Sequence, residues 1–268
     1  MTSSVLLERD GHVAVITINR EDIRNANSTP DVIEAMVDVI EQVNRDPGFH
    51  AAVITGAGKT FSAGGEFKLM ESFNTMPTID VNHYYRHHGI QRFTRALYDL
   101  EVPAVAAVNG PAYGSGFGMA LLCDLRIASE TATFAMNFSK LGILPGDGGA
   151  LFLTRAVGPQ NAAEIFYTGE PISASRALEM GLVLKVLPFD EVLPEALRLA
   201  RQIADRPGPA LRLMKRLLRE AGQAQFSGFL DLTAAMQAMC HTTVEHKDAL
   251  DRLKSDLAKR AAAKAAKP

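Results

Sequence analysis

Two glycine-rich segments of the chain are suited to bringing backbone amides close to a ligand. Residues 109–124, NGPAYGSGFGMALLCD, pass through a turn that contains Ser115 and continue into an apolar helix. Glycine lets a ligand atom approach the main chain, and the first turn of a helix leaves N–H groups unpaired. Residues 55–65, TGAGKTFSAGG, form a second such turn, and each turn follows a predicted buried strand. The pair predicts an oxyanion hole, a preorganised set of N–H donors for a developing negative charge.

The composition is that of a globular protein and argues against several classes of partner. The chain has 268 residues, of which 47% are hydrophobic and 22% charged, and its net charge is −2. This balance argues against nucleic acid or a membrane surface as a partner, and no apolar run approaches the ~20 residues that span a bilayer. The first residues show no signal-peptide pattern, and the two cysteines, Cys123 and Cys240, suit a reducing compartment. We therefore expect a cytoplasmic protein.

Strands and helices alternate over the segments that must position these turns. Short apolar runs at residues 5–8 and 13–19 flank Asp10-Gly11, a pair typical of a hairpin turn. Buried strands are predicted at residues 51–55, 104–108, 125–128 and 182–186. Helices are predicted at residues 30–44, 80–99, 116–122, 148–157, 159–167 and 173–180, and almost throughout from residue 191. This order is typical of the α/β class followed by a helical region.

The domain organisation follows from this change of pattern. We expect an α/β core over residues 1–190, a helical region over residues 191–258, and a disordered, low-complexity tail over residues 259–268. The helical region is apolar on one face and needs a surface to cover. A neighbouring subunit would supply that surface, so we expect an oligomer.

Three long segments carry motifs of a known family. They are residues 60–70 (TFSAGGEFKLM), 103–129 (PAVAAVNGPAYGSGFGMALLCDLRIAS) and 141–158 (LGILPGDGGALFLTRAVG). In content and order they resemble the enoyl-CoA hydratase/isomerase (crotonase) family, and the likeness extends over nearly the whole chain. The resemblance implies a spiral of ββα units with a C-terminal helical region that packs in trimers or in dimers of trimers. It also implies an acyl-CoA substrate bound by the 1–190 core, with no cofactor beyond the coenzyme A of that substrate.

The resemblance further implies which residues hold the substrate. The thioester oxygen would accept hydrogen bonds from the amides of Ala63 and Ser115 while charge develops on it as an enolate. Losing one such donor typically costs about 2.7–4 kcal/mol of transition-state stabilisation. The other residues expected to contact the substrate or its CoA are Arg24, Ser62, Gly65, Glu66, Lys68, Tyr113, Gly114 and Phe138.

The chain departs from the family pattern at both positions where hydratases of the family carry a glutamate. Gly118 stands three residues after Ser115, and Phe138 stands in the segment FAMNFSKLG. Adding water to a double bond needs a base to activate the water and an acid to protonate carbon. Glycine and phenylalanine can do neither, so simple hydration of a 2-enoyl-CoA is not expected.

The remaining candidate acid and base is Asp147, in the loop LPGDGGA. Some isomerases of the family lack both glutamates and use an aspartate directly after the proline of this loop. Here Gly146 separates Pro145 from Asp147, so the match is offset by one position. Asp147 also precedes a predicted helix, where capping would be worth about 1 kcal/mol. The residues leave both roles open.

We therefore expect an acyl-CoA enzyme that moves a double bond, with Asp147 carrying a proton between two carbons. One alternative is a hydratase that uses other acid and base groups. Another is an acyl-CoA-binding subunit without catalytic activity. In the segment HYYRHH, His83 and His87 are four residues apart, but no third ligand is evident, so no metal site is expected. Family comparison places this segment near the acyl group, where one of its histidines or Tyr84 is a candidate contact.

Overall fold

A six-stranded sheet forms the centre of the computed structural model, which describes residues 3–265. Its strands, in spatial order, are β1 (Val5–Asp10), β2 (Val13–Ile18), β3 (Ala51–Gly56), β4 (Ala104–Val108), β6 (Leu125–Ser129) and β9 (Lys185–Leu187). β1 and β2 pair antiparallel, as the predicted hairpin requires, and all later neighbours pair parallel. The hairpin and the buried strands are confirmed, although the last strand begins at Lys185 rather than at residue 182.

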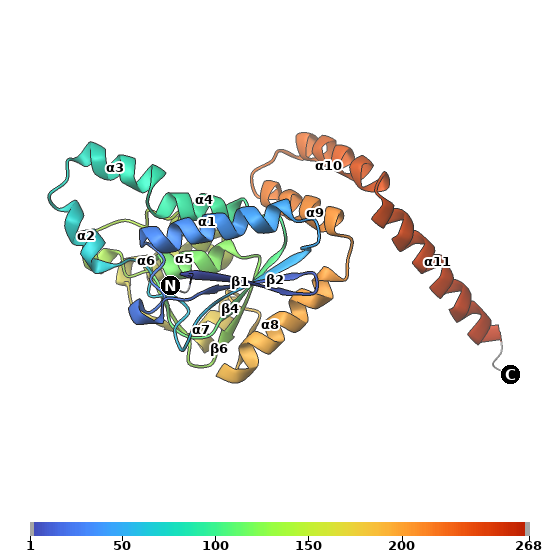
Figure 1. Ribbon diagram of the computed structural model, residues 1–268, viewed down its shortest axis with the longest axis horizontal. Helices are drawn as coiled ribbons and strands as arrows, with labels where there is room; N and C mark the ends of the chain where they lie inside the picture. Colours follow the sequence, from blue (N-terminus) through green and yellow to red (C-terminus); the bar gives the residue numbers. More distant parts are fainter. Residues whose placement is uncertain (1–2, 266–268) are drawn as a thin grey trace.

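Both faces of this sheet are buried, which explains the continuous apolar runs in its strands. Neighbouring residues of β3 point to opposite sides, so Ile54 joins one core cluster and Val53 joins another. The first cluster includes residues of α1 (Pro30–Arg45), α4 (Ile90–Tyr98) and α5 (Ser115–Leu122), and the second includes residues of α8 (Phe189–Ala204) (Figure 1). Helices on both faces make the sheet a rigid platform for the loops at its edge.

A second, three-stranded sheet gives the chain a repeating ββα order. Its strands are β5 (Ala112–Tyr113), β7 (Thr133–Ala135) and β8 (Ile172–Ser173). β4 of the large sheet leads to β5 and then α5, and β6 leads to β7 and then α6 (Gly149–Thr168). The preceding unit starts at β3, and an isolated bridge between Ser62 and Ala112 joins it to β5 of the small sheet. Because the units stack side by side, turns at equivalent points of successive units become neighbours.

A glycine divides the helix predicted at residues 80–99. The segment forms α3 (Thr78–His87) and α4, and Gly89 precedes the first residue of α4. A Cβ atom placed on Gly89 would lie 2.9 Å from Tyr84 Cε1. Close packing of the Tyr84 ring on this turn therefore needs a residue without a side chain.

The remaining helices of the core largely match their predicted ranges. The two helices predicted at residues 148–157 and 159–167 both lie within α6, and the non-helical backbone of Gly158 (φ 78°, ψ 166°) separates them. The other short helices are α2 (Phe67–Phe73), α7 (Ala174–Glu179) and the 3-10 turns η1 (Glu21–Ile23) and η2 (Ser139–Leu141). The structure therefore shows the expected α/β class and its spiral of ββα units.

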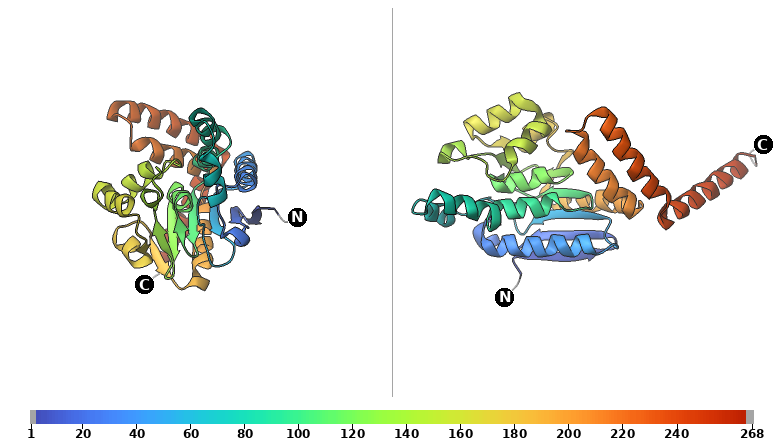
Figure 2. Two further views of the ribbon diagram at one scale, coloured as in Figure 1. Left: turned by 90° about the vertical axis from the view of Figure 1, so that its left-hand side faces the viewer. Right: turned by 90° about the horizontal axis from the view of Figure 1, so that it is seen from above.

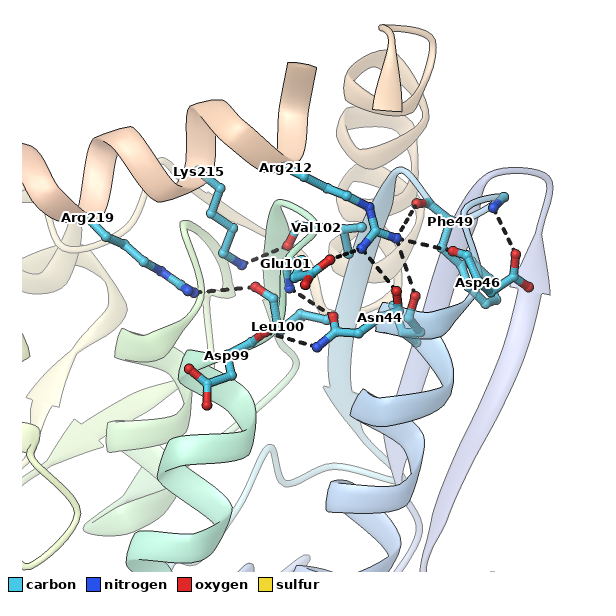
Figure 3. A network of polar contacts seen from close by, with 12 residues as sticks. Asn44, Asp46, Phe49, Asp99, Leu100, Glu101, Val102, Arg212, Lys215 and Arg219 are labelled. Carbon is cyan, nitrogen blue, oxygen red and sulfur yellow. Dashed lines mark hydrogen bonds and ion pairs between the residues drawn. The ribbon is translucent and has the colours of Figure 1, made fainter. Parts of the chain in front are cut away.

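Cations fix α9 (Gly208–Ala221) to this core (Figure 3). Arg212 donates to the main-chain oxygen of Asn44 at 3.2 Å, at the C-terminal end of α1. Lys215 is buried and pairs with Asp124 at 3.0 Å. Carbonyl groups at the end of a helix lack helical partners, so Arg212 satisfies a group that would otherwise need water.

The helical region predicted from residue 191 divides into two parts. α8 packs on the sheet and α9 is fixed beside it. α10 (Phe226–His241) packs against α9, and α11 (Val244–Ala265) leads away from the core (Figures 1 and 2). Along α11, Leu253 and Leu257 are each 55% exposed. Within residues 3–265, no helix has an apolar stretch that could cross a membrane.

The prediction of a disordered tail over residues 259–268 is wrong for the part that the structure describes. Residues 259–265 form the last turns of α11. Their low complexity was the wrong signal, because alanine and lysine are among the residues with the highest helix propensity. Residues 266–268 lie outside the described part of the chain.

Candidate active site

The two predicted glycine turns lie side by side, just beyond the ends of β3 and β4. Ser62 pairs with Ala112 across an isolated parallel bridge, and the Tyr113 amide donates to the Ser62 oxygen at 3.0 Å. Three residues further along each segment stand Gly65 and Ser115. These two residues therefore occupy equivalent places in neighbouring ββα units.

Hydrogen bonds within the protein decide which amides of these turns are open to a ligand. The Ala63 N–H donates to the Arg24 oxygen at 2.9 Å. For the Gly65 N–H, no hydrogen-bond partner is found within residues 3–265. Ser115 is the first residue of α5, where amides lack helical partners. The expectation of Ala63 as a donor is therefore wrong, because its N–H is already used; Gly65 takes its place beside Ser115.

An uncommon backbone conformation brings the Arg24 carbonyl to this position. Arg24 and Asn25 have φ values of 53° and 55°, in a left-handed region that is costly for residues with side chains. The Asn25 side chain supports this loop by donating to the main-chain oxygens of Ala57 (2.8 Å) and Thr60 (2.7 Å). The loop is thereby held against the first glycine turn, where it occupies the Ala63 amide.

A buried asparagine, Asn27, ties the two turns together. Its Nδ2 donates to the Ser115 oxygen at 3.0 Å, and its Oδ1 accepts from Ser115 Oγ at 2.6 Å. Its own amide donates to the Gly64 oxygen at 2.9 Å. Because Asn27 is 0% exposed, water does not compete for these bonds, and they hold the two turns in a defined relative position. Sequence reasoning missed this residue, whose partner Ser115 lies 88 positions away.

Gly65, Ser115 and Asp147 line one cavity. α2 and α3 form part of its wall, and most of the other lining side chains are apolar or aromatic. The other lining residues are Ser28, Leu69, Met70, Phe73, Tyr84, Tyr85, Ile90, Phe138, Ile143, Leu144 and Gly146. Walls of this kind exclude water and strengthen the effect of fixed N–H groups on a developing charge. The structure thus brings the predicted Ser115 and Asp147 together and adds Gly65.

A second groove adjoins this cavity and shares Gly65, Met70 and Phe138 with it. Most of the residues predicted to contact the substrate line this groove. They are Arg24, Ala63, Gly65, Glu66, Tyr113, Gly114 and Phe138. A long ligand can therefore lie in the groove with one end in the cavity.

Two predicted contact residues lie elsewhere. Ser62 is 0% exposed, and its Oγ donates to the Asn25 oxygen at 2.7 Å and accepts from the Gly64 amide at 3.2 Å. Its side chain therefore supports the turn instead of facing a ligand. Lys68 is exposed on α2 and is not among the described residues that line the cavity or the groove.

The two oxygens of the Asp147 carboxyl have different surroundings. It is 4% exposed, and its Oδ1 accepts from the Gly149 amide at 2.9 Å, at the start of α6. Its Oδ2 is buried and has no hydrogen-bond partner within residues 3–265. Burial raises the pKa of Asp147 above its ordinary value, against a smaller lowering effect of the Gly149 bond. One oxygen therefore serves the helix start, and the other is available for proton transfer.

The position of this carboxyl explains the glycine at residue 118. A Cβ atom on Gly118 would overlap Asp147 Oδ2. The carboxylate thus fills the space that a side chain on α5 would need, one helical turn after Ser115. The extra Gly146 between Pro145 and Asp147 therefore does not keep the carboxyl out of the cavity.

Comparison with known proteins identifies the family of the chain. The family model described as enoyl-CoA hydratase/isomerase matches residues 8–258. The chain is 34% identical to a crotonyl-CoA hydratase of Syntrophomonas wolfei and 36% identical to a short-chain-enoyl-CoA hydratase of Clostridium acetobutylicum, covering 92% of this chain and 93% of each relative. The crystal structure of an enoyl-CoA hydratase from Bacillus anthracis matches with a TM-score of 0.87 at 30% identity, covering 94% of this chain and 96% of that one. With its crotonase fold and its paired glycine turns, the chain belongs to the enoyl-CoA hydratase/isomerase family.

Proposed function

We propose that this acyl-CoA enzyme moves the double bond of an enoyl-CoA, with Asp147 as both base and acid. The observation that most supports the proposal is the unpaired Oδ2 of Asp147, in the cavity that the Gly65 and Ser115 residues also line. A carboxylate and two open amides in one apolar cavity suit proton transfer next to a thioester. The absent glutamates leave Asp147 as the one carboxyl among the described lining residues of this cavity.

The reaction begins with the thioester oxygen at the amides of Gly65 and Ser115. Ionised Asp147 removes a proton from C2 of a 3-enoyl-CoA, and the electron pair moves onto the thioester oxygen to give a dienolate. Each amide that stabilises this oxyanion is worth about 2.7–4 kcal/mol. The protonated carboxyl then returns the proton to C4, so the double bond moves from C3–C4 to C2–C3.

The surroundings of Asp147 favour this chemistry over hydration. Burial raises the pKa of its carboxyl, which makes the ionised form a stronger base than an exposed aspartate. The neighbouring Phe138 and the other apolar walls give a water molecule no second carboxylate to bind. A proton removed from one carbon is therefore returned to carbon.

We further propose that the adjoining groove holds coenzyme A. Arg24 lines this groove, and a guanidinium suits phosphate. The exposed apolar residues of α10 and α11, Phe226 and Leu257 among them, support a homotrimer or a dimer of trimers. A cytoplasmic location fits the charge and composition of the chain. Light scattering coupled to size-exclusion chromatography measures the oligomeric state, and a monomer would contradict that part of the proposal.

The experiment that tests the reaction follows the conversion of 3-hexenoyl-CoA to 2-hexenoyl-CoA. D147N should lower kcat by about 10²–10⁴-fold, because it removes the proton carrier and keeps the shape of the side chain. D205N, at the end of α8, is the matched control and should leave kcat unchanged. Unchanged isomerisation and unchanged exchange of the α-proton in D147N would overturn the proposal.

Hydration is the second candidate, because the relatives named above are called hydratases. It requires acid and base groups other than the two family glutamates. Measured hydration of crotonyl-CoA that is faster than isomerisation of 3-hexenoyl-CoA would favour it. Tight binding of acyl-CoA without any exchange of its α-proton would instead indicate a subunit that has lost catalysis.

A further inference from the structure

The cavity wall contains a second buried polar atom that the proposed reaction does not use. Tyr84 lines the same cavity as Asp147. Its hydroxyl is buried and has no hydrogen-bond partner within residues 3–265. Among the described side chains, only three such atoms are found, and Tyr84 and Asp147 supply the two that belong to this cavity.

The environment of Tyr84 holds the ring without offering its hydroxyl a partner. The ring packs against Phe73 at 5.3 Å between centroids, and against the main chain of Gly89, which leaves no room for a side chain there. A phenylalanine would make the same contacts. A buried hydroxyl without a partner costs folding free energy, so the hydroxyl calls for a bond that a ligand supplies.

The other lining residues indicate what kind of ligand atom this is. No arginine, lysine or histidine is found among the described residues that line the cavity, and Asp147 is an acid. A carboxylate on the acyl group would therefore lack a counter-charge. Burial raises the pKa of the Tyr84 hydroxyl, so it stays protonated and can donate. A neutral oxygen atom is the partner that satisfies it.

We propose that Tyr84 hydrogen-bonds an uncharged oxygen atom on the acyl chain, so that the protein prefers keto- or hydroxyacyl-CoA over plain hydrocarbon acyl-CoA. The inference rests on the proposed function, because it places the acyl group in this cavity. It adds a specificity-determining residue and a class of substrate. A site built to hydrogen-bond a substrate oxygen discriminates against the analogue that lacks it.

The test measures binding by calorimetry, which does not depend on turnover. Wild type, Y84F and the control Y98F are titrated with hexanoyl-CoA and with analogues whose keto group stands successively farther from the thioester. The Arg219 guanidinium carbon lies over the Tyr98 ring, 4.4 Å from its centroid, and Tyr98 is not among the described residues of the cavity wall. The wild type and Y98F should bind at least one keto analogue about tenfold more tightly than hexanoyl-CoA, which corresponds to about 1.4 kcal/mol.

Y84F should lose this preference, bind hexanoyl-CoA as the wild type does, and melt at the same or a higher temperature. A wild type without preference for any keto analogue, or a Y84F variant that keeps the preference, would overturn the inference. If the same samples isomerise 3-hexenoyl-CoA, the proposed function holds even when either of these two outcomes overturns the role of Tyr84. Failure of the wild type to bind any acyl-CoA would overturn both.

Discussion

Asp147 and Gly118 are a matched pair: the Asp147 carboxylate lies where a side chain at residue 118 would have to be. The two residues come from different elements, the loop before α6 and the middle of α5. The Asp147 carboxylate and a side chain at residue 118 therefore exclude each other. The carboxylate lines the same cavity as Gly65 and Ser115.

This pairing predicts that the effect of G118A changes sign with the residue at position 147. In the wild type the new methyl group would overlap Asp147, and overpacking typically costs about 1–3 kcal/mol. In a D147A background the overlap is gone, and G118A should stabilise α5 by about 1 kcal/mol through helix propensity. Chemical denaturation of the four variants measures both effects. G222A, at a glycine with open space around it, is the control for a glycine-to-alanine substitution. Equal changes in the free energy of unfolding on adding G118A to the wild type and to D147A would refute the pairing.

The stability of the protein should depend on pH through Asp147. The pKa of its carboxyl is raised in the folded state above the ordinary 3.8. A raised folded pKa means that the protonated form favours folding, so this stabilisation is lost as the pH rises through the folded pKa. D147N should therefore unfold at a higher temperature than the wild type at about pH 7, and the difference should disappear near about pH 4. A D147N variant that unfolds at a lower temperature than the wild type at about pH 7, with a difference that shrinks towards acid pH, would show that Asp147 is stabilised as the anion.

Asn27 should be a positioning residue for the paired amides. N27A removes the two side-chain bonds to Ser115 and leaves Ser115 Oγ without its partner, while the main-chain bond to Gly64 remains. We expect a loss of about 1–3 kcal/mol in the free energy of unfolding. We also expect kcat to fall while the affinity for coenzyme A alone, measured by calorimetry, stays unchanged. N74A, at the exposed end of α2, is the control. A normal kcat in N27A would mean that the two turns hold their positions without the Asn27 side chain.

Lys215 should contribute more to stability than other lysines of the C-terminal helices. It is 3% exposed, donates to the Val102 oxygen at 2.7 Å and pairs with Asp124 (Figure 3 shows the bond to Val102). K215A removes both bonds of a buried ammonium, and because Asp124 is 28% exposed we expect a loss of about 1–3 kcal/mol and a lower melting temperature. K254A removes the exposed pair with Asp251 and should cost about 0–1 kcal/mol. Similar melting temperatures for the two variants would contradict this.

The elements that sequence reasoning predicted well are those determined by local pattern. Apolar runs marked the strands of the large sheet, because a parallel strand buried on both faces has little polar surface. The glycines before Ser115 marked its turn for the same local reason. The break at Gly89 was missed, because it depends on the packing of the Tyr84 ring, which no short segment reveals.

The features that sequence reasoning missed depend on contacts between distant segments. The choice between Ala63 and Gly65 follows from the bridge of Ser62 to Ala112 and from the Arg24 carbonyl, and neither is visible in the turn itself. Asn27 stands in a loop without a motif, and its role appears only when both turns are placed beside it. The direction of the Asp147 carboxyl likewise needed the position of α5.

We propose that the N–H groups of Gly65 and Ser115 stabilise the negative charge on the enolate oxygen. Replacing the amide of a residue by an ester removes its N–H and keeps the shape of the chain. The measurement compares kcat for 3-hexenoyl-CoA isomerisation between a variant with this change at residue 65 and one with it at residue 63. Each ester also weakens the carbonyl of the preceding residue as an acceptor. This is the Gly64 carbonyl for the ester at residue 65 and the Ser62 carbonyl for the ester at residue 63. Each of these carbonyls accepts one main-chain bond, so the two variants are matched. The ester at Gly65 should lower kcat by about 10²–10³-fold, whereas the ester at Ala63 should reduce stability and leave kcat within about a factor of ten. An equal or larger loss of kcat at Ala63 would contradict the assignment of the oxyanion hole.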